Sequence, residues 1–193
     1  MIEPGNVTAC LVTRGDVNMH PILESLLGYR EVIVWDNSIR PDWKVAGRYT
    51  AMLQASTDWI YLQDDDTIVP RSTQSALLYA DGYDCVANWG HGKDPLGYDD
   101  LPLVCGGAIV SRWAAWEAIA RYGELWPLDD SFKYEADFII GTLYRVWRHE
   151  HLPFEIRDVA YNGRRLADEP WQAALKHDMT TRARAIRNVE KAA

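Results

Sequence analysis

The sequence has 193 residues, of which 48% are apolar and 25% are charged, a balance typical of a globular protein rather than a disordered or fibrous one. Its 28 acidic residues exceed its 20 basic residues, and the formal net charge is −8. This charge argues against a protein that binds nucleic acid mainly through a basic surface. Any anionic ligand must therefore be held by local features.

The length suits one full-sized domain, and we expect a single domain over residues 1–193. No run of about 18 apolar residues occurs, and residues 1–5 lack the order of a signal peptide, so we expect a soluble, cytoplasmic protein without a membrane span. The three cysteines, Cys10, Cys85 and Cys105, lie far apart in apolar stretches and are expected to be buried free thiols.

Strands and helices are predicted to alternate along the first half of the chain. Short apolar runs predict buried strands at 7–12, 31–35, 59–63 and 85–88, and helical spacing predicts helices near 16–27, 45–55 and 72–79. This βαβ series is typical of a mostly parallel sheet flanked by helices, an α/β fold whose ligands bind at the carboxyl ends of the strands.

The second half is less regular. The predicted elements are a Gly-rich loop at 91–100, a strand at 103–110, a helix through Trp113 and Trp116, a helix from Glu135 to Trp147, a strand at 154–159 and a helix from Trp171 onward. Most of the nine tryptophans should lie in the core, although a few could form a platform for a flat ligand.

Three consecutive carboxylates, Asp64, Asp65 and Asp66, follow the third predicted strand. Two such charges about 6 Å apart repel by roughly 3 kcal/mol at an effective dielectric of 20. A divalent cation such as Mg²⁺ or Mn²⁺ would offset this repulsion and could hold a diphosphate through its remaining positions. A solvated acidic loop is the alternative.

Asp36 and Asn37 end the second predicted strand. Because neighbouring strands of a parallel sheet end at one crevice, these side chains are expected near the carboxylate run. The alternative is a plain turn, since Asp-Asn-Ser is a favourable turn sequence.

Together, residues 7–13, the tip Asp36–Ser38, Arg48 and the segment 61–66 resemble GT-A-fold glycosyltransferases of family 2 or the exostosin-like type, with their DxD or DDD motif. The resemblance implies a nucleotide diphosphate sugar as donor and Mn²⁺ or Mg²⁺ as cofactor. It places the metal on Asp64 and Asp66. The residues implied to contact the donor in this half are Thr13, Arg14, Asp36, Asn37, Arg48, Asp64 and Asp65.

The resemblance extends into the second half. Gly106 and Gly107 resemble the small-residue strand that lets sugar and acceptor approach the backbone. Glu135 and Asp137 resemble the family's acidic pair, whose aspartate acts as catalytic base, although Ala136 separates them where the family has adjacent acids. Asp129 and Asp130 are rival candidates for the base.

Two residues near the end of the chain complete the expected site. In relatives a late histidine binds the metal and a basic residue steadies the diphosphate, roles that fall here to His177 and Arg182. By this resemblance, residues of about 1–100 bind the nucleotide sugar, and about 101–193 supply the acceptor and catalytic half.

We therefore expect a metal-dependent glycosyltransferase that moves a sugar to an acceptor hydroxyl, by inversion or retention. The acceptor could be a glycan, a protein or modified DNA, and an oligomer is possible. One alternative is a phosphatase of the haloacid dehalogenase type using Asp64 and Asp66, although Ile68 replaces the Thr or Val of that motif. Another is a non-catalytic carbohydrate- or calcium-binding module, although the segment does not follow the EF-hand pattern.

Overall fold

A computed structural model describes residues 1–88, 102, 104, 106–156, 171, 174–175, 177–179, 181–182 and 185–186. Its strands are β1 (Val7–Thr13), β2 (Glu31–Asp36), β3 (Trp59–Leu62), β4 (Thr67–Ile68), β5 (Cys85–Asn88), β6 (Ala108–Ser111), β7 (Trp147–Glu150) and β8 (Glu155–Ile156). Its α-helices are α1 (His20–Ser25), α2 (Gly47–Ala51), α3 (Arg71–Leu77), α4 (Arg112–Leu125) and α5 (Asp130–Leu143). Short 3₁₀ turns are η1 (Pro4–Asn6), η2 (Lys44–Ala46) and η3 (Met52–Gln54).

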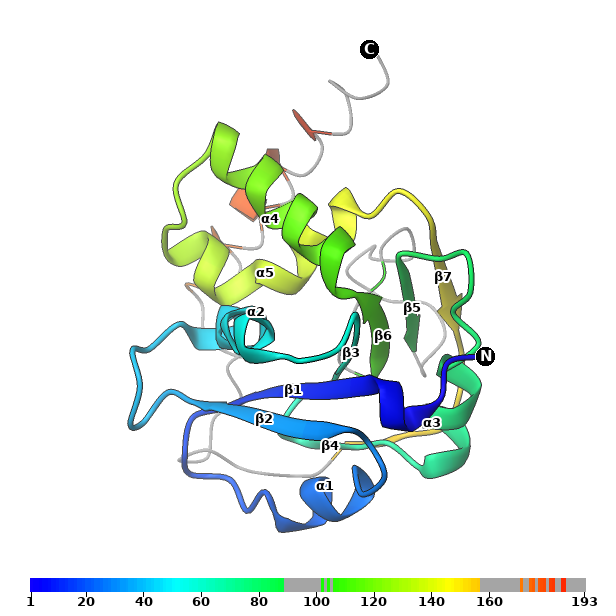
Figure 1. The fold of residues 1–193 in the computed structure, drawn as a ribbon. Helices are drawn as coiled ribbons and strands as arrows, with labels where there is room; N and C mark the ends of the chain where they lie inside the picture. The colour runs from blue at the N-terminus through cyan, green and yellow to red at the C-terminus, as the bar shows by residue number, and fades with distance from the viewer. Residues whose placement is uncertain are drawn as a thin grey trace.

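Six strands form the central sheet in the order β2-β1-β3-β6-β5-β7 (Figure 1). The pairs β1/β2, β1/β3 and β5/β7 are parallel, and only β6 runs against its two neighbours. A separate two-stranded sheet joins β4 to β8. The prediction of an α/β fold with a mostly parallel central sheet is confirmed, and strands from both halves of the chain share that sheet.

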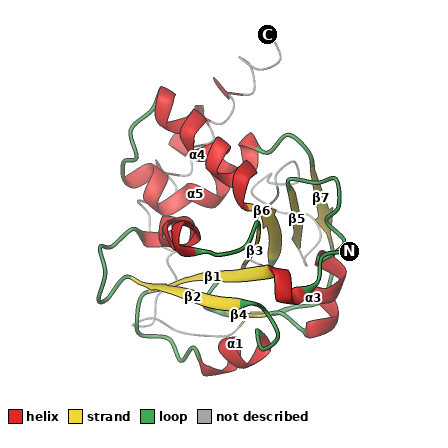
Figure 2. Ribbon diagram, viewed as in Figure 1, coloured by secondary structure: helices red, strands yellow, loops and turns green. Residues whose placement is uncertain are grey.

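Helices cover both faces of the sheet (Figure 2). Side chains of β1 alternate between two cores: Cys10 and Val12 pack with residues of α2, α4 and α5, whereas Ala9 and Leu11 pack with residues of α1 and α3. All four side chains are buried because β1 lies in the interior of the sheet. This burial explains its nearly continuous apolar sequence.

The predicted strand at 103–110 begins later than expected. The backbone N–H of Gly107 donates to the carbonyl of Val104 at 3.0 Å, and the φ angle of Gly107 is +93°. This turn prevents an extended strand before Ala108. Leu103, Cys105 and the predicted loop at 91–100 lie outside the described residues.

The predicted helix from Glu135 to Trp147 was wrong at both ends. Helix α5 begins at Asp130, with Asp129 as its N-cap, and ends at Leu143. Trp147 instead begins β7, which pairs with β5 and was missed because Val146 and Trp147 continue the helical spacing of apolar residues. The predicted strand at 154–159 is represented by β8, and residues 157–159 lie outside the described part.

Cys10 and Cys85 are buried and free, as predicted, and Cys105 lies outside the described residues. The described residues between 171 and 186 are helical, in agreement with the predicted C-terminal helix. Within the described ranges, every helix is too short or too polar to cross a bilayer.

Candidate active site

The carboxylate run forms a turn between β3 and β4. The backbone N–H of Thr67 donates to the carbonyl of Asp64 at 3.3 Å, which closes the turn. The side chain of Gln63 stabilises the turn through two hydrogen bonds. Its N–H donates to the carbonyl of Thr67, and its oxygen accepts from the hydroxyl of Tyr61, each at 2.8 Å. The buried amide of Gln63 therefore fixes where the carboxylates begin.

Arg48 on α2 joins this turn to α5. Its Nη2 lies 2.6 Å from Asp64 Oδ1, and its Nη1 lies 3.5 Å from Asp137 Oδ2. The Arg48 side chain is only 3% exposed, against 31% for Asp64 and 19% for Asp137. A buried guanidinium between two carboxylates stays charged: burial opposes its charge, but Asp137 and Asp64 raise the pKa of Arg48 above its ordinary value.

Asp137 also accepts a hydrogen bond from Tyr49, whose hydroxyl lies 2.7 Å from Oδ1. Burial raises the pKa of Asp137 to about 6, although Arg48 and Tyr49 act in the opposite direction. Helix α5 departs from helical geometry at Glu135, where φ is −124° and ψ is 26°. Asp137 thus stands in the first turn after a kink, held by two residues of α2.

The carboxylate run meets the requirements of a cation site in part. Asp65 Oδ2 is buried and accepts no hydrogen bond among the described residues. Burial, with the charges of Asp64 and Asp65, raises the pKa of Asp66 to about 6. These features mark an excess of negative charge that a divalent cation would neutralise, so the run fits a metal.

Protein side chains alone do not complete that site. In the part of the chain that the structure describes, no group of three or more His, Cys, Asp or Glu side chains could hold a metal ion. Mg²⁺ commonly binds one or two carboxylates and takes its remaining ligands from water and phosphate. The donor set here suits such an ion rather than a closed structural site.

The predicted donor-binding residues at the ends of β1 and β2 lie together. Thr13 and Asp36 are partners in the strand register, and the backbone N–H of Asn37 donates to the carbonyl of Thr13 at 2.9 Å. Burial raises the pKa of Asp65 and the Thr13 side chain lowers it, which places this edge next to the carboxylate run. Arg14 follows directly and lies 3.6 Å from Asp16.

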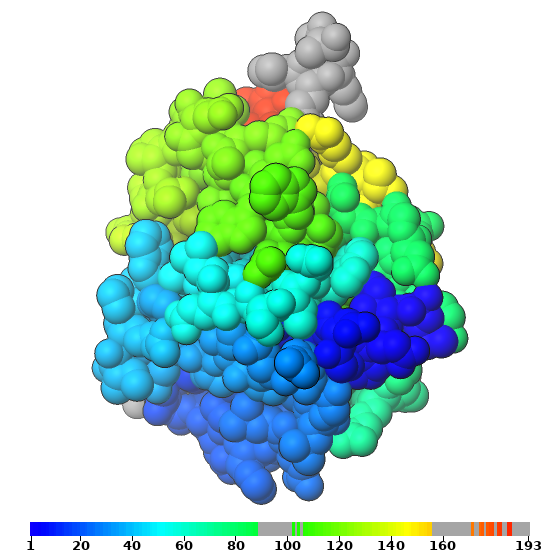
Figure 3. All heavy atoms as spheres, viewed as in Figure 1, coloured from blue at the N-terminus to red at the C-terminus, as the bar shows by residue number. Residues whose placement is uncertain are grey.

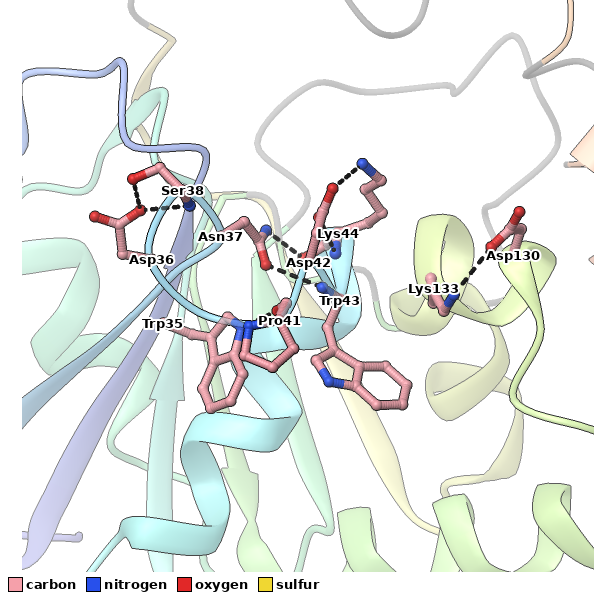
Figure 4. Close-up of polar contacts among 10 residues, drawn as sticks. All are labelled: Trp35, Asp36, Asn37, Ser38, Pro41, Asp42, Trp43, Lys44, Asp130 and Lys133. Carbon is pink, nitrogen blue, oxygen red and sulfur yellow. Dashed lines mark hydrogen bonds and ion pairs between the residues drawn. The ribbon is translucent and has the colours of Figure 1, made fainter.

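The side chains of Asp36 and Asn37 form hydrogen bonds within the loop that follows β2 (Figure 4). Asp36 Oδ1 accepts from the backbone N–H and the hydroxyl of Ser38, bonds that lower the pKa of Asp36. Asn37 holds the next loop, because its amide donates to the carbonyl of Lys44 and accepts from the N–H of Trp43, each at 3.1 Å. Their predicted contact with the donor remains a prediction.

Gly106 and Gly107 are required by packing. A Cβ atom at Gly106 would collide with the carbonyl of Asn88, and one at Gly107 would lie 2.8 Å from the Tyr61 hydroxyl. A close approach of sugar to this backbone remains a prediction.

Arg182 contacts α4 and the start of α5, and among the described residues neither Arg182 nor His177 contacts the carboxylate run. Arg182 is 2.9 Å from Asp129 and 2.7 Å from Asp178, and it donates to the hydroxyl of Tyr122 at 2.6 Å. The His177 side chain is exposed. Their expected roles at the diphosphate and the metal remain predictions.

Asp129 and Asp130, the rival candidates for the base, have structural partners. Asp129 caps the N-terminus of α5 and pairs with Arg182, whereas Asp130 is exposed and pairs with Lys133.

Sequence reasoning missed Tyr49 and Gln63. Tyr49 is 3% exposed and occupies an apolar position of its helix, so its pattern is that of a core residue. Gln63 carried a usable signal, since a polar residue that ends a buried strand must find partners for its amide.

A hollow of about 110 Å³ lies elsewhere, between α4 and the end of α5. Asp84, which lines it, precedes β5, so the hollow is at the amino end of the sheet. It does not include any of the site residues predicted above.

No protein-family model and no curated protein matches the sequence. Solved structures do match: glucosyl-3-phosphoglycerate synthase from Mycobacterium tuberculosis aligns over 92% of this chain and 78% of its own, with a TM-score of 0.56 and 11% identity. The same enzyme in complex with Mn²⁺, UDP-glucose and phosphoglyceric acid aligns over 92% and 79%, with a TM-score of 0.54 and 12% identity. Residues 1–349 of S. aureus TarS align over 79% of this chain but only 60% of their own, with a TM-score of 0.46 and 10% identity. The chain thus has the α/β fold of GT-A glycosyltransferases.

Proposed function

We propose that this protein is a metal-dependent glycosyltransferase that moves a sugar from a nucleotide diphosphate sugar to an acceptor hydroxyl. The observation that carries the proposal is the buried Arg48, which links the carboxylate run to Asp137 at the carboxyl end of the sheet. Residues of about 1–100 would bind the donor, and about 101–193 would complete the catalytic and acceptor side of one domain.

Donor binding would use the edge formed by Thr13, Asp36 and the carboxylate run. Asp64 and Asp66 would hold Mg²⁺ or Mn²⁺, which supplies positive charge to the diphosphate leaving group. Arg48 fixes the position of Asp64 through their 2.6 Å ion pair. The Mn²⁺ and UDP-glucose in the complex of the mycobacterial enzyme agree with this choice of ligands.

Asp137 would act as general base in an inverting transfer. Its carboxylate would take the proton from the acceptor hydroxyl while the hydroxyl oxygen bonds to the anomeric carbon and the nucleoside diphosphate departs. A pKa of about 6 suits this task, because the carboxylate is ionised at neutral pH yet more basic than an exposed aspartate. Tyr49 and Arg48 hold it in one orientation, and Glu135 at the kink is the second candidate.

Thermal unfolding tests donor binding without knowledge of the acceptor. UDP-, GDP- and dTDP-sugars are screened with and without Mn²⁺ on the native protein and on the Asp64→Ala and Asp66→Ala variants. Asp58→Ala is the matched control, because Asp58 is 93% exposed and precedes the other end of β3. A ligand at a hundredfold excess over its dissociation constant stabilises the protein by about 2.7 kcal/mol.

We expect a metal-dependent shift with one nucleotide class that is lost in both site variants and kept in Asp58→Ala. Absence of any nucleotide shift, together with a shift from Mg²⁺ and a phosphate mimic, would overturn the proposal in favour of a phosphatase.

A further inference from the structure

A lysine and two aromatic rings form a cluster beside the proposed active site. Lys44 Nζ lies 5.5 Å from the centre of the Tyr134 ring, and the centres of the Tyr134 and Trp171 rings lie 4.8 Å apart in an edge-to-face arrangement. We call Lys44, Tyr134 and Trp171 the aromatic–lysine cluster. Nearby, Lys133 Nζ lies 5.9 Å from the Trp43 ring.

Two of the three cluster residues come from the chain segments that carry Arg48 and Asp137. Lys44 precedes Arg48 by four residues, and Tyr134 precedes Asp137 by three, so the same two segments make both pairs. Exposure rises outward: the Arg48 side chain is 3% exposed and the Lys44 side chain 35%. Trp171 is 41% exposed. The cluster therefore shares two segments with the Arg48–Asp137 pair, and its Lys44 and Trp171 are far more exposed than Arg48.

The loop that carries Lys44 is fixed in place (Figure 4). Asn37 binds both the carbonyl of Lys44 and the N–H of Trp43, and the Trp35 indole donates to the carbonyl of Pro41 at 3.1 Å. Lys44 itself has a φ of +51°, a left-handed conformation that costs energy for a lysine. The fold thus holds Lys44 in a strained backbone conformation, with its ammonium group 5.5 Å from the centre of the Tyr134 ring.

The chemistry of the cluster defines its ligand. Partly exposed aromatic rings bind the apolar face of a sugar, and an ammonium group binds phosphate or carboxylate oxygens. In a protein of net charge −8, a local cation is the means by which an anionic ligand is held. Asp42 pairs with Lys44 and occupies the position that such an anion would take.

We propose that the aromatic–lysine cluster is the subsite for an acceptor sugar that carries a phosphate or carboxylate group. The inference rests on the proposed glycosyltransferase function, since it assigns the acceptor of that same site. The sugar lies on the rings of Tyr134 and Trp171, and its anionic group replaces Asp42 at Lys44.

Ligand-observed saturation-transfer NMR measures this binding directly. The probes are glucose 6-phosphate and glucuronate, with methyl β-glucoside as the neutral control. The variants are Lys44→Asn, which removes the charge with a side chain that tolerates a left-handed backbone, and Tyr134→Ala. The controls are Trp113→Ala, which removes a tryptophan that is 79% exposed on α4, and Arg30→Gln, which removes an exposed cation before β2.

We expect one anionic sugar to bind at least tenfold more tightly than methyl β-glucoside, which corresponds to about 1.4 kcal/mol. Lys44→Asn should abolish this preference, Tyr134→Ala should weaken all three probes, and both controls should bind as the native protein does. Asp42→Asn should strengthen the anionic probe, because it removes a competing carboxylate. The anionic probe with the lower dissociation constant identifies the anion as phosphate or carboxylate.

Equal binding of neutral and anionic probes, no binding of any probe, or a preference that survives Lys44→Asn would overturn the subsite. Each variant is first shown to unfold cooperatively, so a lost preference is not a lost fold. Failure of the donor screen would overturn the glycosyltransferase proposal instead, and the two failures are distinguished because the probe assay contains no nucleotide.

Discussion

The pKa values of carboxylates shift in opposite directions at the two ends of the central sheet. At the amino end, Glu31 Oε1 accepts hydrogen bonds from the N–H and hydroxyl of Ser56 and from the hydroxyl of Thr8, at 2.6 to 2.8 Å. These bonds, those from Ser56 foremost, lower the pKa of Glu31. At the carboxyl end, burial raises the pKa of Asp66 and of Asp137 to about 6.

The difference separates a carboxylate whose charge the protein itself satisfies from carboxylates whose charge it leaves in excess. Glu31 has its ionised form satisfied by the protein, so it stabilises the fold and needs no further partner. The carboxyl end holds more negative charge than its single buried cation, Arg48, neutralises among the described residues. Such a deficit is kept where a ligand or metal supplies the missing charge.

The largest effect is expected for Asp137→Asn, which removes the proposed base. Release of nucleoside diphosphate in the presence of acceptor should fall by about 10²- to 10⁴-fold in kcat. Glu31→Gln is the control and should leave kcat unchanged. Equal effects of the two substitutions would show that the two ends do not differ in function.

Removal of the shared cation should affect stability. Arg48→Met leaves two partly buried carboxylates unpaired, and breaking a buried ion pair in this way costs about 3–5 kcal/mol. Arg112→Met, at the amino end, loses the ion pair with the exposed Asp58 and a hydrogen bond to the Ala55 carbonyl, and should cost only about 1–2 kcal/mol. Urea unfolding measures both, and a cost for Arg48→Met no larger than that of Arg112→Met would contradict the structural role of Arg48.

The Glu31 network should give a smaller, pH-dependent effect. Glu31→Gln should cost about 1–2 kcal/mol at pH 7. Because the folded-state pKa of Glu31 is lowered, its stabilisation is present above the unfolded value of 4.5 and is lost as the pH falls through the folded value. Unfolding free energies of native and variant protein from pH 3 to 7 should therefore converge at the acid end.

The smallest effect is expected from Tyr49→Phe. Its hydroxyl lowers the pKa of Asp137, so its loss should raise that pKa by less than about one unit. The acid limb of kcat/KM, expected near pH 6 in the native protein, should move to higher pH with little change at pH 8. A uniform loss of activity with an unmoved limb would assign Tyr49 to packing alone.

Much of the fold could be predicted because most strands of the first half coincide with apolar runs in the sequence. Val7–Val12 forms the buried interior strand β1 as expected. Glu31–Trp35 also forms a strand, but β2 lies at the edge of the sheet, so its residues Glu31–Val34 are half-buried rather than buried. Strand β7 could not be found, since Trp147–Glu150 has no strand pattern and is extended only by pairing with β5. Long-range pairing of this kind leaves no local signal.

The sequence predicted the acidic residues of the candidate site but not the side-chain contacts that join them. Asp64–Asp66 stand out because three charges follow an apolar strand. That Arg48 joins Asp64 to Asp137, and that Tyr49 holds Asp137, depends on the contact between α2 and α5, which lie far apart in sequence but side by side in space (Figures 1 and 3).

The most direct test of the charge deficit is the titration of the carboxylates by ¹³C NMR with and without Mg²⁺. We predict that Asp66 and Asp137 titrate near pH 6 and that Glu31 titrates below its ordinary value. Saturating Mg²⁺ should lower the pKa of Asp66 and leave Glu31 unchanged. Ordinary values near 4 for all three groups, with no response to Mg²⁺, would contradict the account.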